Sequence, residues 1–191
     1  MRVIGIAGSP RKNGNTAFLV GEALKECEKI GAETELVFLG DKKIEFCSGC
    51  GKCPPCPKDD DVQGVLEKMK SADGIIVGSP TYYGSMSGQL KTFFDRTHPL
   101  RRGGFLLKGK VGGVIAVGGS RNGGQEKVIE GIHSWMFIHD MVVVTDTETA
   151  HFGGIVQGRN LGDAEKDEWG MKTVRNLGRR VAEVAMQLKK T

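Results

Sequence analysis

The chain has 191 residues, of which 39% are hydrophobic and 26% charged, and its formal net charge is +4. This length and composition are typical of one globular domain with a substantial core, so we interpret residues 1–191 as a single domain. The small net charge gives no reason to expect a nucleic-acid partner, and no apolar run reaches the roughly 20 residues of a membrane-spanning helix. Because the first residues lead directly into a strand pattern without the layout of a signal peptide, we expect a cytoplasmic protein.

Strand-like apolar runs alternate with segments of helical periodicity along the chain. Strands are expected at residues 2–7, 33–39, 74–77, 111–117 and 141–144. Helices are expected at residues 16–30, 61–71, 88–96, 125–138 and about 164–189. Strict alternation predicts an α/β fold, in which helices cover both faces of a parallel sheet. Five such units predict a flavodoxin-like doubly wound five-stranded sheet with strand order 2-1-3-4-5 and a cysteine-rich insertion after strand 2.

Three polar loops follow the first, third and fourth strands, at the sheet edge where ligands bind in this kind of fold. The first reads GSPRKNGNT (residues 8–16) and leads into a helix, whose free N–H groups favour phosphate. It has neither the lysine of a Walker loop nor the spacing of a dinucleotide-binding loop. The second, GSPTYYGSMSG (78–88), and the third, GGSRNGGQE (118–126), have backbones that can lie close to a flat heterocycle. One phosphate loop and two such loops on the same edge predict bound FMN.

Four of the five cysteines lie within ten residues, CSGCGKCPPC, which begin at Cys47 and end at Cys56. Clustered cysteines in a cytoplasmic protein indicate metal or redox chemistry rather than structural disulfides. Structural zinc sites usually separate two C-x-x-C pairs by a long stretch, whereas a C-x-x-C-x-x-C run is typical of iron–sulfur ligands. We therefore interpret Cys47, Cys50, Cys53 and Cys56 as ligands of a [4Fe–4S] cluster. Zinc, a structural disulfide set and a thiol–disulfide relay are the alternatives, and Cys27, on an apolar helix face, is expected to be a buried structural thiol.

The three loops, the cysteine motif with DDD after it, and the HSWMFIH and HFGG segments together resemble the iron–sulfur flavoproteins of the NADPH-dependent FMN reductase and flavodoxin-like superfamily. The resemblance covers nearly the whole chain. It implies an FMN-dependent oxidoreductase that takes electrons singly from a ferredoxin-like donor through a [4Fe–4S] cluster to FMN, and passes them to a small acceptor such as oxygen, peroxide or a quinone-like molecule. It also implies homo-oligomers, dimers or homotetramers, in which the cluster of one subunit lies near the flavin of another. An FMN-dependent NAD(P)H oxidoreductase whose cysteine loop is a zinc or thiol element is the alternative, and a carrier or redox sensor without enzymatic activity is a third interpretation.

The resemblance also implies roles for individual residues. Those expected to bind FMN are Ser9, Arg11, Asn15 and Thr16 at the phosphate, Pro80, Thr81, Tyr82, Tyr83, Gly84 and Ser85 along the ring and ribityl chain, and Gly119, Ser120, Gly123 and Gly124 at the ring edge. Because the redox chemistry belongs to the flavin, no side chain is expected to act as a general acid or base. The cysteine motif loop (residues 47–61) departs from the family pattern, since only Pro54 and Pro55 separate Cys53 from Cys56. The sequence leaves open whether Cys56 completes the cluster.

Overall fold

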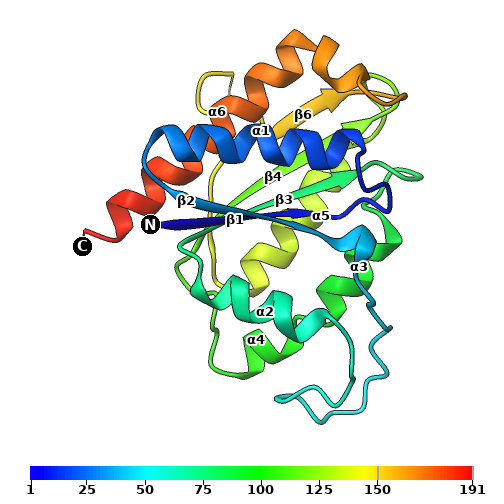
Figure 1. Ribbon diagram of the computed structural model, residues 1–191, viewed down its shortest axis with the longest axis vertical. Helices are drawn as coiled ribbons and strands as arrows, with labels where there is room; N and C mark the ends of the chain where they lie inside the picture. Colours follow the sequence, from blue (N-terminus) through cyan, green and yellow to red (C-terminus); the bar gives the residue numbers. More distant parts are fainter. Residues whose placement is uncertain (150, 191) are drawn as a thin grey trace.

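Six parallel strands form the central sheet of the computed structural model, which describes residues 1–149 and 151–190. They are β1 (Arg2–Ala7), β2 (Glu33–Phe38), β3 (Gly74–Pro80), β4 (Val111–Gly118), β5 (Val142–Val143) and β6 (Gly154–Gln157). Their order is β2-β1-β3-β4-β5, with β6 also paired to β4 (Figure 1). The predicted α/β fold with flavodoxin-like strand order is therefore confirmed.

Two short strands, β5 and β6, share the last position of the sheet. The sequence predicts only one strand here, at residues 141–144. β5 pairs with residues 111–112 of β4, and β6 pairs with residues 115–118, so the chain leaves the sheet edge between the two strands and then returns. Gly153 passes so close to β4 on this return that an added Cβ atom would lie 2.4 Å from the carbonyl oxygen of Val114. This close approach gives a physical reason for a glycine in the HFGG segment, and it lets β6 reach the carboxyl edge of the sheet.

Helices cover both faces of the sheet (Figure 1). On one face are α1 (Asn15–Lys29) and α6 (Glu168–Leu188), and on the other are α2 (Val62–Ser71), α3 (Gly88–Asp95) and α5 (Gln125–Ile138). A short helix α4 (His98–Arg102) follows α3, and two 3-10 turns, η1 (Leu39–Asp41) and η2 (Asp163–Lys166), follow β2 and β6. In the part of the chain that the structure describes, no helix is both long and apolar enough to cross a membrane.

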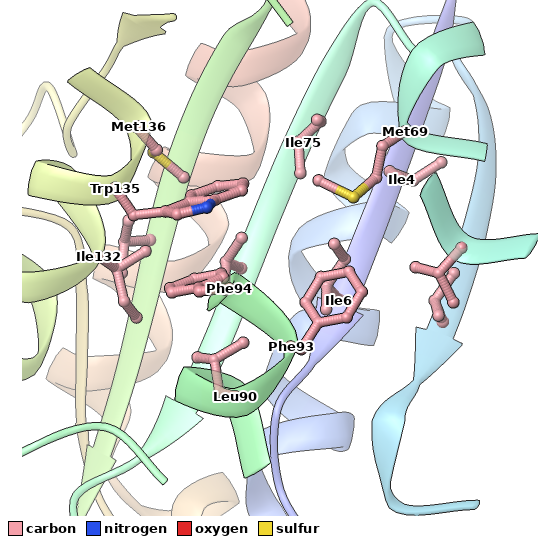
Figure 2. Close-up of a cluster of buried hydrophobic side chains, with 14 of the residues drawn as sticks. Ile4, Ile6, Met69, Ile75, Leu90, Phe93, Phe94, Ile132, Trp135 and Met136 are labelled. Atoms are coloured by element: carbon pink, nitrogen blue, oxygen red, sulfur yellow. The ribbon is translucent and has the colours of Figure 1, made fainter. Parts of the chain in front are cut away.

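Helix α3 is fixed to the sheet by a buried apolar face, which Figure 2 shows from close by. Leu90 and Phe93 are fully buried, and the ring of Phe94 stacks on Trp135 of α5 with a centroid separation of 4.2 Å. Ser87 caps the start of this helix by accepting a 3.1 Å hydrogen bond from the backbone N–H of Leu90. Burial of each large apolar side chain, here Leu90, Phe93 and Phe94, stabilises the fold by about 1.5–3 kcal/mol. Both ends of α3 are therefore held in fixed positions relative to the sheet.

Candidate functional site

The three loops predicted from the sequence meet at the carboxyl edge of the sheet, where they surround a cavity of about 210 Å³. The predicted FMN-binding residues that line this cavity are Ser9, Arg11, Asn15, Thr16, Pro80, Thr81, Tyr82 and Gly119. Gly158 and Arg159, from the loop after β6, line it as well. The sequence does not predict these two residues, because it gives no sign of β6 itself.

The start of α1 forms the end of this cavity that suits an anion. The backbone N–H groups of Asn15 and Thr16 have no partner within the helix because they lie in its first turn, and Gly14 before them offers no side-chain cap. The Ser9 hydroxyl accepts a 3.1 Å hydrogen bond from the backbone N–H of Arg11, which fixes the turn before the helix. Free N–H groups and the positive end of the helix dipole favour a phosphate group at this point.

The side chain of Asn15 holds the loop that follows β6. Its amide nitrogen donates to the carbonyl oxygen of Asn160 at 2.8 Å, and its oxygen accepts from the backbone N–H of Gly162 at 3.1 Å. Arg159, next in the chain to Asn160, lies over Gly119, where an added Cβ atom would be 3.5 Å from its Nε. Since both polar atoms of the Asn15 side chain have partners within the protein, its backbone N–H is the group left to meet a phosphate.

Thr81 places a hydroxyl group without a partner in the wall of the cavity. Its backbone N–H donates to the carbonyl oxygen of Val117 at 2.8 Å, which holds the residue against the end of β4. Its hydroxyl oxygen is buried and has no hydrogen-bond partner among the described residues. Because buried polar groups are nearly always paired in folded proteins, this hydroxyl fits a site that a polar ligand completes. The residues present therefore fit the phosphate and ribityl portion of FMN.

The second loop forms a tight hairpin that touches the third loop. The backbones of Tyr82 and Ser85 exchange hydrogen bonds of 2.9 and 3.0 Å. Between them Tyr83 (φ 50°) and Gly84 (φ 73°) both adopt the left-handed conformation that two-residue hairpin turns need. An added Cβ atom on Gly124 would lie 3.3 Å from the Cα atom of Gly84, so the two loops are in contact. The exposed Tyr83 and the hairpin thus form one rim of the candidate flavin site.

Gln125 fixes the shape of the third loop, a role that the sequence does not reveal. Its buried amide nitrogen donates to the carbonyl oxygen of Ser120 at 2.8 Å, and its oxygen accepts from the backbone N–H of Gly123 at 2.8 Å. Gly118 leaves room for this side chain, since a Cβ atom there would lie 2.5 Å from the amide nitrogen. These bonds tie Ser120 and Gly123 of the exposed loop to the buried side chain of Gln125.

The four clustered cysteines line a second cavity, of about 190 Å³, beyond the carboxyl end of α3. All four are free thiols. The other charged or titratable side chains around the cavity are Lys58, Arg96, His98 and Arg102. The loop extends away from the sheet near α4 (Figure 1), and no lining residue is shared with the cavity at the carboxyl edge. The two candidate sites are thus separate within one chain.

The thiols of the cysteine loop differ in environment. The backbone N–H of Lys52 donates to Cys50 and lowers the pKa of its thiol, whereas burial and the neighbouring Cys56 raise the pKa of Cys53. Among residues 1–149 and 151–190, no three side chains of His, Cys, Asp or Glu are already gathered into a closed metal site. Four soft sulfur donors nevertheless form a ligand set that suits an iron–sulfur cluster or zinc. The donor chemistry fits a cluster, and its ligands are partly exposed.

Cys27 is outside this cavity. It is fully buried between α1 and α6, where its Sγ atom donates to the carbonyl oxygen of Gly178 at 3.1 Å. Burial raises the pKa of its thiol to about 12. The prediction of a buried structural thiol is confirmed.

Comparison with known proteins gives a consistent result for sequence and fold. The family model described as NADPH-dependent FMN reductase matches residues 1–153. The chain is 53% identical to an iron–sulfur flavoprotein of Methanocaldococcus jannaschii over 194 aligned positions that cover all of both chains. It is 46% identical to an iron–sulfur flavoprotein of Methanosarcina thermophila, over 100% of this chain and 98% of that protein. A solved structure of a flavone reductase has the same fold, with a TM-score of 0.75 at 23% identity, and the match covers 99% of this chain and 64% of the flavone reductase chain.

Proposed function

The chain belongs to the NADPH-dependent FMN reductase family and, within it, to the iron–sulfur flavoproteins, and on that premise we propose that it binds FMN at the carboxyl edge of the sheet and a [4Fe–4S] cluster in the cysteine loop. Family membership makes it an FMN-dependent electron-transfer oxidoreductase. We further propose that electrons enter singly from a ferredoxin-like donor at the cysteine loop and leave from FMN to a small acceptor.

The proposed FMN site rests on the polar groups at the carboxyl edge. Arg11 and Arg159 can each form a charge-assisted hydrogen bond to the phosphate, beside the free N–H groups at the start of α1. The buried hydroxyl of Thr81 can pair with a polar atom of the ribityl chain or ring. When bound, FMN accepts two electrons together or one at a time, and the cluster supplies them singly. The protein contributes binding and orientation, and none of its side chains is assigned proton transfer.

The proposed cluster site rests on one observation: four free thiols line a single cavity with basic walls. The proposed ligands are Cys47, Cys50, Cys53 and Cys56. A cluster held by four thiolates carries net negative charge, which the neighbouring Arg102 would offset, together with Lys58 and Arg96 to the extent that their own partners Glu45 and Asp60 leave their charge unbalanced. Clustered cysteines that bind metal are typical of a reducing compartment, so the proposal includes a cytoplasmic location.

The separation of the two cavities supports a homo-oligomeric assembly, a dimer or a tetramer. The helix between them, α3, has 8 residues and therefore spans roughly 12 Å. The two cavities share no lining residue, so direct contact between cluster and FMN would require the cysteine loop of one subunit to lie at the carboxyl edge of another. We propose this arrangement, which places Tyr83 and the hairpin of one subunit next to the cysteine loop of its partner.

Anaerobic purification followed by analysis of FMN, iron, inorganic sulfide and zinc tests the proposal. We expect FMN together with iron and sulfide in the ratio of a [4Fe–4S] cluster. Cys50→Ala should remove the iron and sulfide but leave FMN bound, whereas Cys27→Ala, which changes a cysteine remote from the loop, should remove neither. Stoichiometric zinc in place of iron would contradict the cluster.

Rapid mixing with two electron donors distinguishes the proposal from an NAD(P)H oxidoreductase, which the family description favours as the second candidate. Reduced ferredoxin should bleach the flavin absorbance of the wild-type protein and do so much more slowly in Cys50→Ala. Fast bleaching by NADPH that is the same in both proteins would favour direct hydride transfer to the flavin and leave the cysteine loop outside the reaction.

A further inference from the structure

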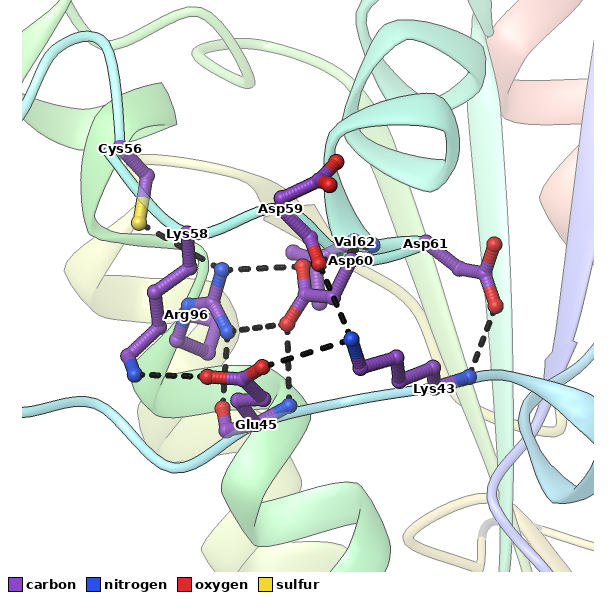
Figure 3. A network of polar contacts seen from close by, with 9 residues as sticks. All are labelled: Lys43, Glu45, Cys56, Lys58, Asp59, Asp60, Asp61, Val62 and Arg96. Atoms are coloured by element: carbon purple, nitrogen blue, oxygen red, sulfur yellow. Dashed lines mark hydrogen bonds and ion pairs between the residues drawn. The ribbon is translucent and has the colours of Figure 1, made fainter.

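The guanidinium group of Arg96 connects the cysteine loop to the end of α3 (Figure 3). Its Nη2 atom donates a hydrogen bond to the Cys56 sulfur over 3.4 Å. We propose that Arg96 is a positioning residue, which fixes the Cys56 sulfur as a ligand and raises the reduction potential of the cluster by donating to that sulfur. This inference rests on the proposed iron–sulfur function of the loop and adds a residue that lies 40 positions from Cys56 in the chain.

The orientation of Arg96 is fixed by bonds to two other groups, Asp60 and the carbonyl oxygen of Glu45. Its side chain and that of Asp60 are only 2% and 1% exposed, and they form a two-pronged ion pair with distances of 2.6 Å from Nη1 to Oδ2 and 3.1 Å from Nη2 to Oδ1. Nη1 also donates to the carbonyl oxygen of Glu45 at 2.8 Å. The four N–H groups of the two Nη atoms thus go to Asp60, Glu45 and Cys56. A planar guanidinium held at three points cannot turn away from the sulfur without breaking buried bonds.

The two ends of the cysteine loop are joined to each other through the aspartates of the DDD motif (Figure 3). Asp60 accepts from the backbone N–H of Glu45 at 2.9 Å, and Asp61 accepts from the backbone N–H of Lys43 at 2.7 Å. The backbone N–H of Asp61 donates in return to the carbonyl oxygen of Lys43 at 3.1 Å. Lys58 adds an ion pair to Glu45 at 2.9 Å. These contacts close the loop at its base, and Arg96 extends them to the sulfur of Cys56.

The backbone of Arg96 is positioned by the core, whereas its guanidinium group is held by the base of the cysteine loop. Arg96 ends α3, and its backbone N–H donates to the carbonyl oxygen of Phe93, which is fully buried against the sheet. By contrast, Cys47 and Cys50 are exposed. The hydrogen bond from Arg96 therefore ties the Cys56 sulfur to the end of a helix that is packed on the sheet, and this favours its assignment as the fourth ligand despite the short Pro54-Pro55 spacer.

A hydrogen-bond donor with positive charge beside a ligand sulfur stabilises the reduced cluster more than the oxidised one. Reduction adds one electron and no proton in this description, so the cluster becomes more negative, and the N–H donor interacts more strongly with its sulfur. Removing the donor should lower the midpoint potential. It should also weaken retention of the metal, because loss of an outer-shell partner typically costs about 10- to 100-fold in metal affinity.

The test compares wild-type protein with Arg96→Gln, Arg96→Lys and Arg102→Gln, all purified and reconstituted anaerobically. Arg102 lines the same cavity from an exposed position, so it is a control for charge without a fixed contact to Cys56. The measurements are FMN content, iron and sulfide content, cluster loss to a chelator, and the cluster midpoint potential from a redox titration followed by electron paramagnetic resonance. We expect Arg96→Gln to lower the potential and to lose iron about 10-fold faster. Arg96→Lys should show a smaller change in the same direction, and Arg102→Gln the smallest.

The outcomes separate this inference from the function on which it rests. Wild-type protein without iron and sulfide would contradict the proposed function itself. A wild-type cluster whose potential and stability are unchanged in both Arg96 variants, or lowered equally by Arg102→Gln, would overturn the role of Arg96. Retained FMN and an unchanged circular dichroism spectrum show that a variant is folded. If Arg96→Gln does not fold, Arg96→Lys decides, because it keeps the charge but loses the two-pronged geometry.

Discussion

Asn15 and Asn160 lie 145 positions apart in the chain and are joined by a 2.8 Å hydrogen bond from the Asn15 amide to the Asn160 carbonyl oxygen. With the second bond from Gly162, this contact ties the loop after β6 to the first turn of α1. As a result, Arg159 lines the same cavity as Arg11. The proposed phosphate site is thus built from segments near both ends of the chain, and an arginine that no loop motif identifies becomes a main candidate ligand.

Replacing Arg159 with Ala should weaken binding of FMN but not of riboflavin, which has no phosphate. A charge-assisted hydrogen bond contributes about 1.5–3 kcal/mol, so we expect an increase of roughly 10- to 100-fold in the Kd for FMN. Quenching of flavin fluorescence measures both ligands. Arg175→Ala is the matched control, because Arg175 pairs with Glu22 of α1 and does not line this cavity. An equal loss of affinity for both flavins would mean that Arg159 shapes the site without contacting phosphate.

Thr81→Val should have opposite effects on the protein with and without flavin. The Thr81 hydroxyl is buried without a partner, so its removal at nearly constant volume should leave the free energy of unfolding of the flavin-free protein unchanged or raise it by about 1 kcal/mol. The same substitution should raise the Kd for FMN roughly 10-fold, because a hydrogen bond to the ligand is lost. Urea unfolding and FMN titration measure the two quantities, and Thr81→Ser, which keeps the hydroxyl, serves as the control. Unchanged FMN affinity in Thr81→Val would contradict the assignment.

Two glycine-to-alanine substitutions should change stability in opposite directions. A Cβ atom on Gly178 of α6 would lie 2.2 Å from the carbonyl oxygen of Ala23 in α1, so the helices would have to separate. We expect Gly178→Ala to lower the free energy of unfolding by about 1–3 kcal/mol. Gly21, inside α1, has nothing within 4 Å of an added Cβ atom, and Gly21→Ala should raise stability by about 0.5–1 kcal/mol. Thermal or urea unfolding of both variants tests the close packing of α1 against α6. A Gly178→Ala variant as stable as the wild-type protein would contradict this packing.

The stability of the protein should fall in mild acid because of His139. Burial lowers the pKa of this residue to about 4, and the positive charge of Arg101 acts in the same direction. As pH falls from about 6.5 to about 4, the histidine becomes protonated in the unfolded chain but not in the folded one, so unfolding is increasingly favoured. The loss should reach about 3 kcal/mol at pH 4 and be absent above pH 7, since one pKa unit corresponds to about 1.4 kcal/mol.

His139→Gln provides the comparison for this pH dependence. Glutamine cannot titrate, yet its amide can still donate to the Thr97 hydroxyl, which lies 3.1 Å from the His139 ring nitrogen. Between pH 7 and pH 4 the free energy of unfolding of the variant should therefore fall by about 3 kcal/mol less than that of the wild-type protein. Parallel curves for the two proteins would show that His139 is not responsible.

The sheet order and the three predicted loops could be read from the sequence, because each long buried strand ends directly at a glycine-rich polar segment. β6 could not, since Gly154–Gln157 has only four residues and follows an irregular stretch, so it has too few positions for a periodic pattern. Arg159 was missed for the same reason. Gln125 was missed because its bonds to Ser120 and Gly123 are made within one loop, where residue type alone does not determine side-chain direction.

The cysteine motif shows the same limit in another form. The spacing of the cysteines predicts thiolate ligands for a cluster, because thiol chemistry depends on the local run of cysteines, and this stays a prediction. The contact between Arg96 and Cys56 could not be predicted, because it joins a helix end to a loop 40 positions away through a buried aspartate. The DDD motif carries no structural prediction of its own, whereas in the fold two of its members, Asp60 and Asp61, accept hydrogen bonds at the base of the loop.

The bond between Arg96 and Cys56 also makes the four cysteines unequal. The Cys56 sulfur accepts from a buried arginine, whereas Cys47 and Cys50 are exposed on a segment whose two glycines, Gly49 and Gly51, adopt left-handed conformations. Loss of Cys56 would therefore remove the sulfur that connects the cysteine loop to the end of α3, whereas loss of Cys47 would remove an exposed sulfur and leave that connection in place.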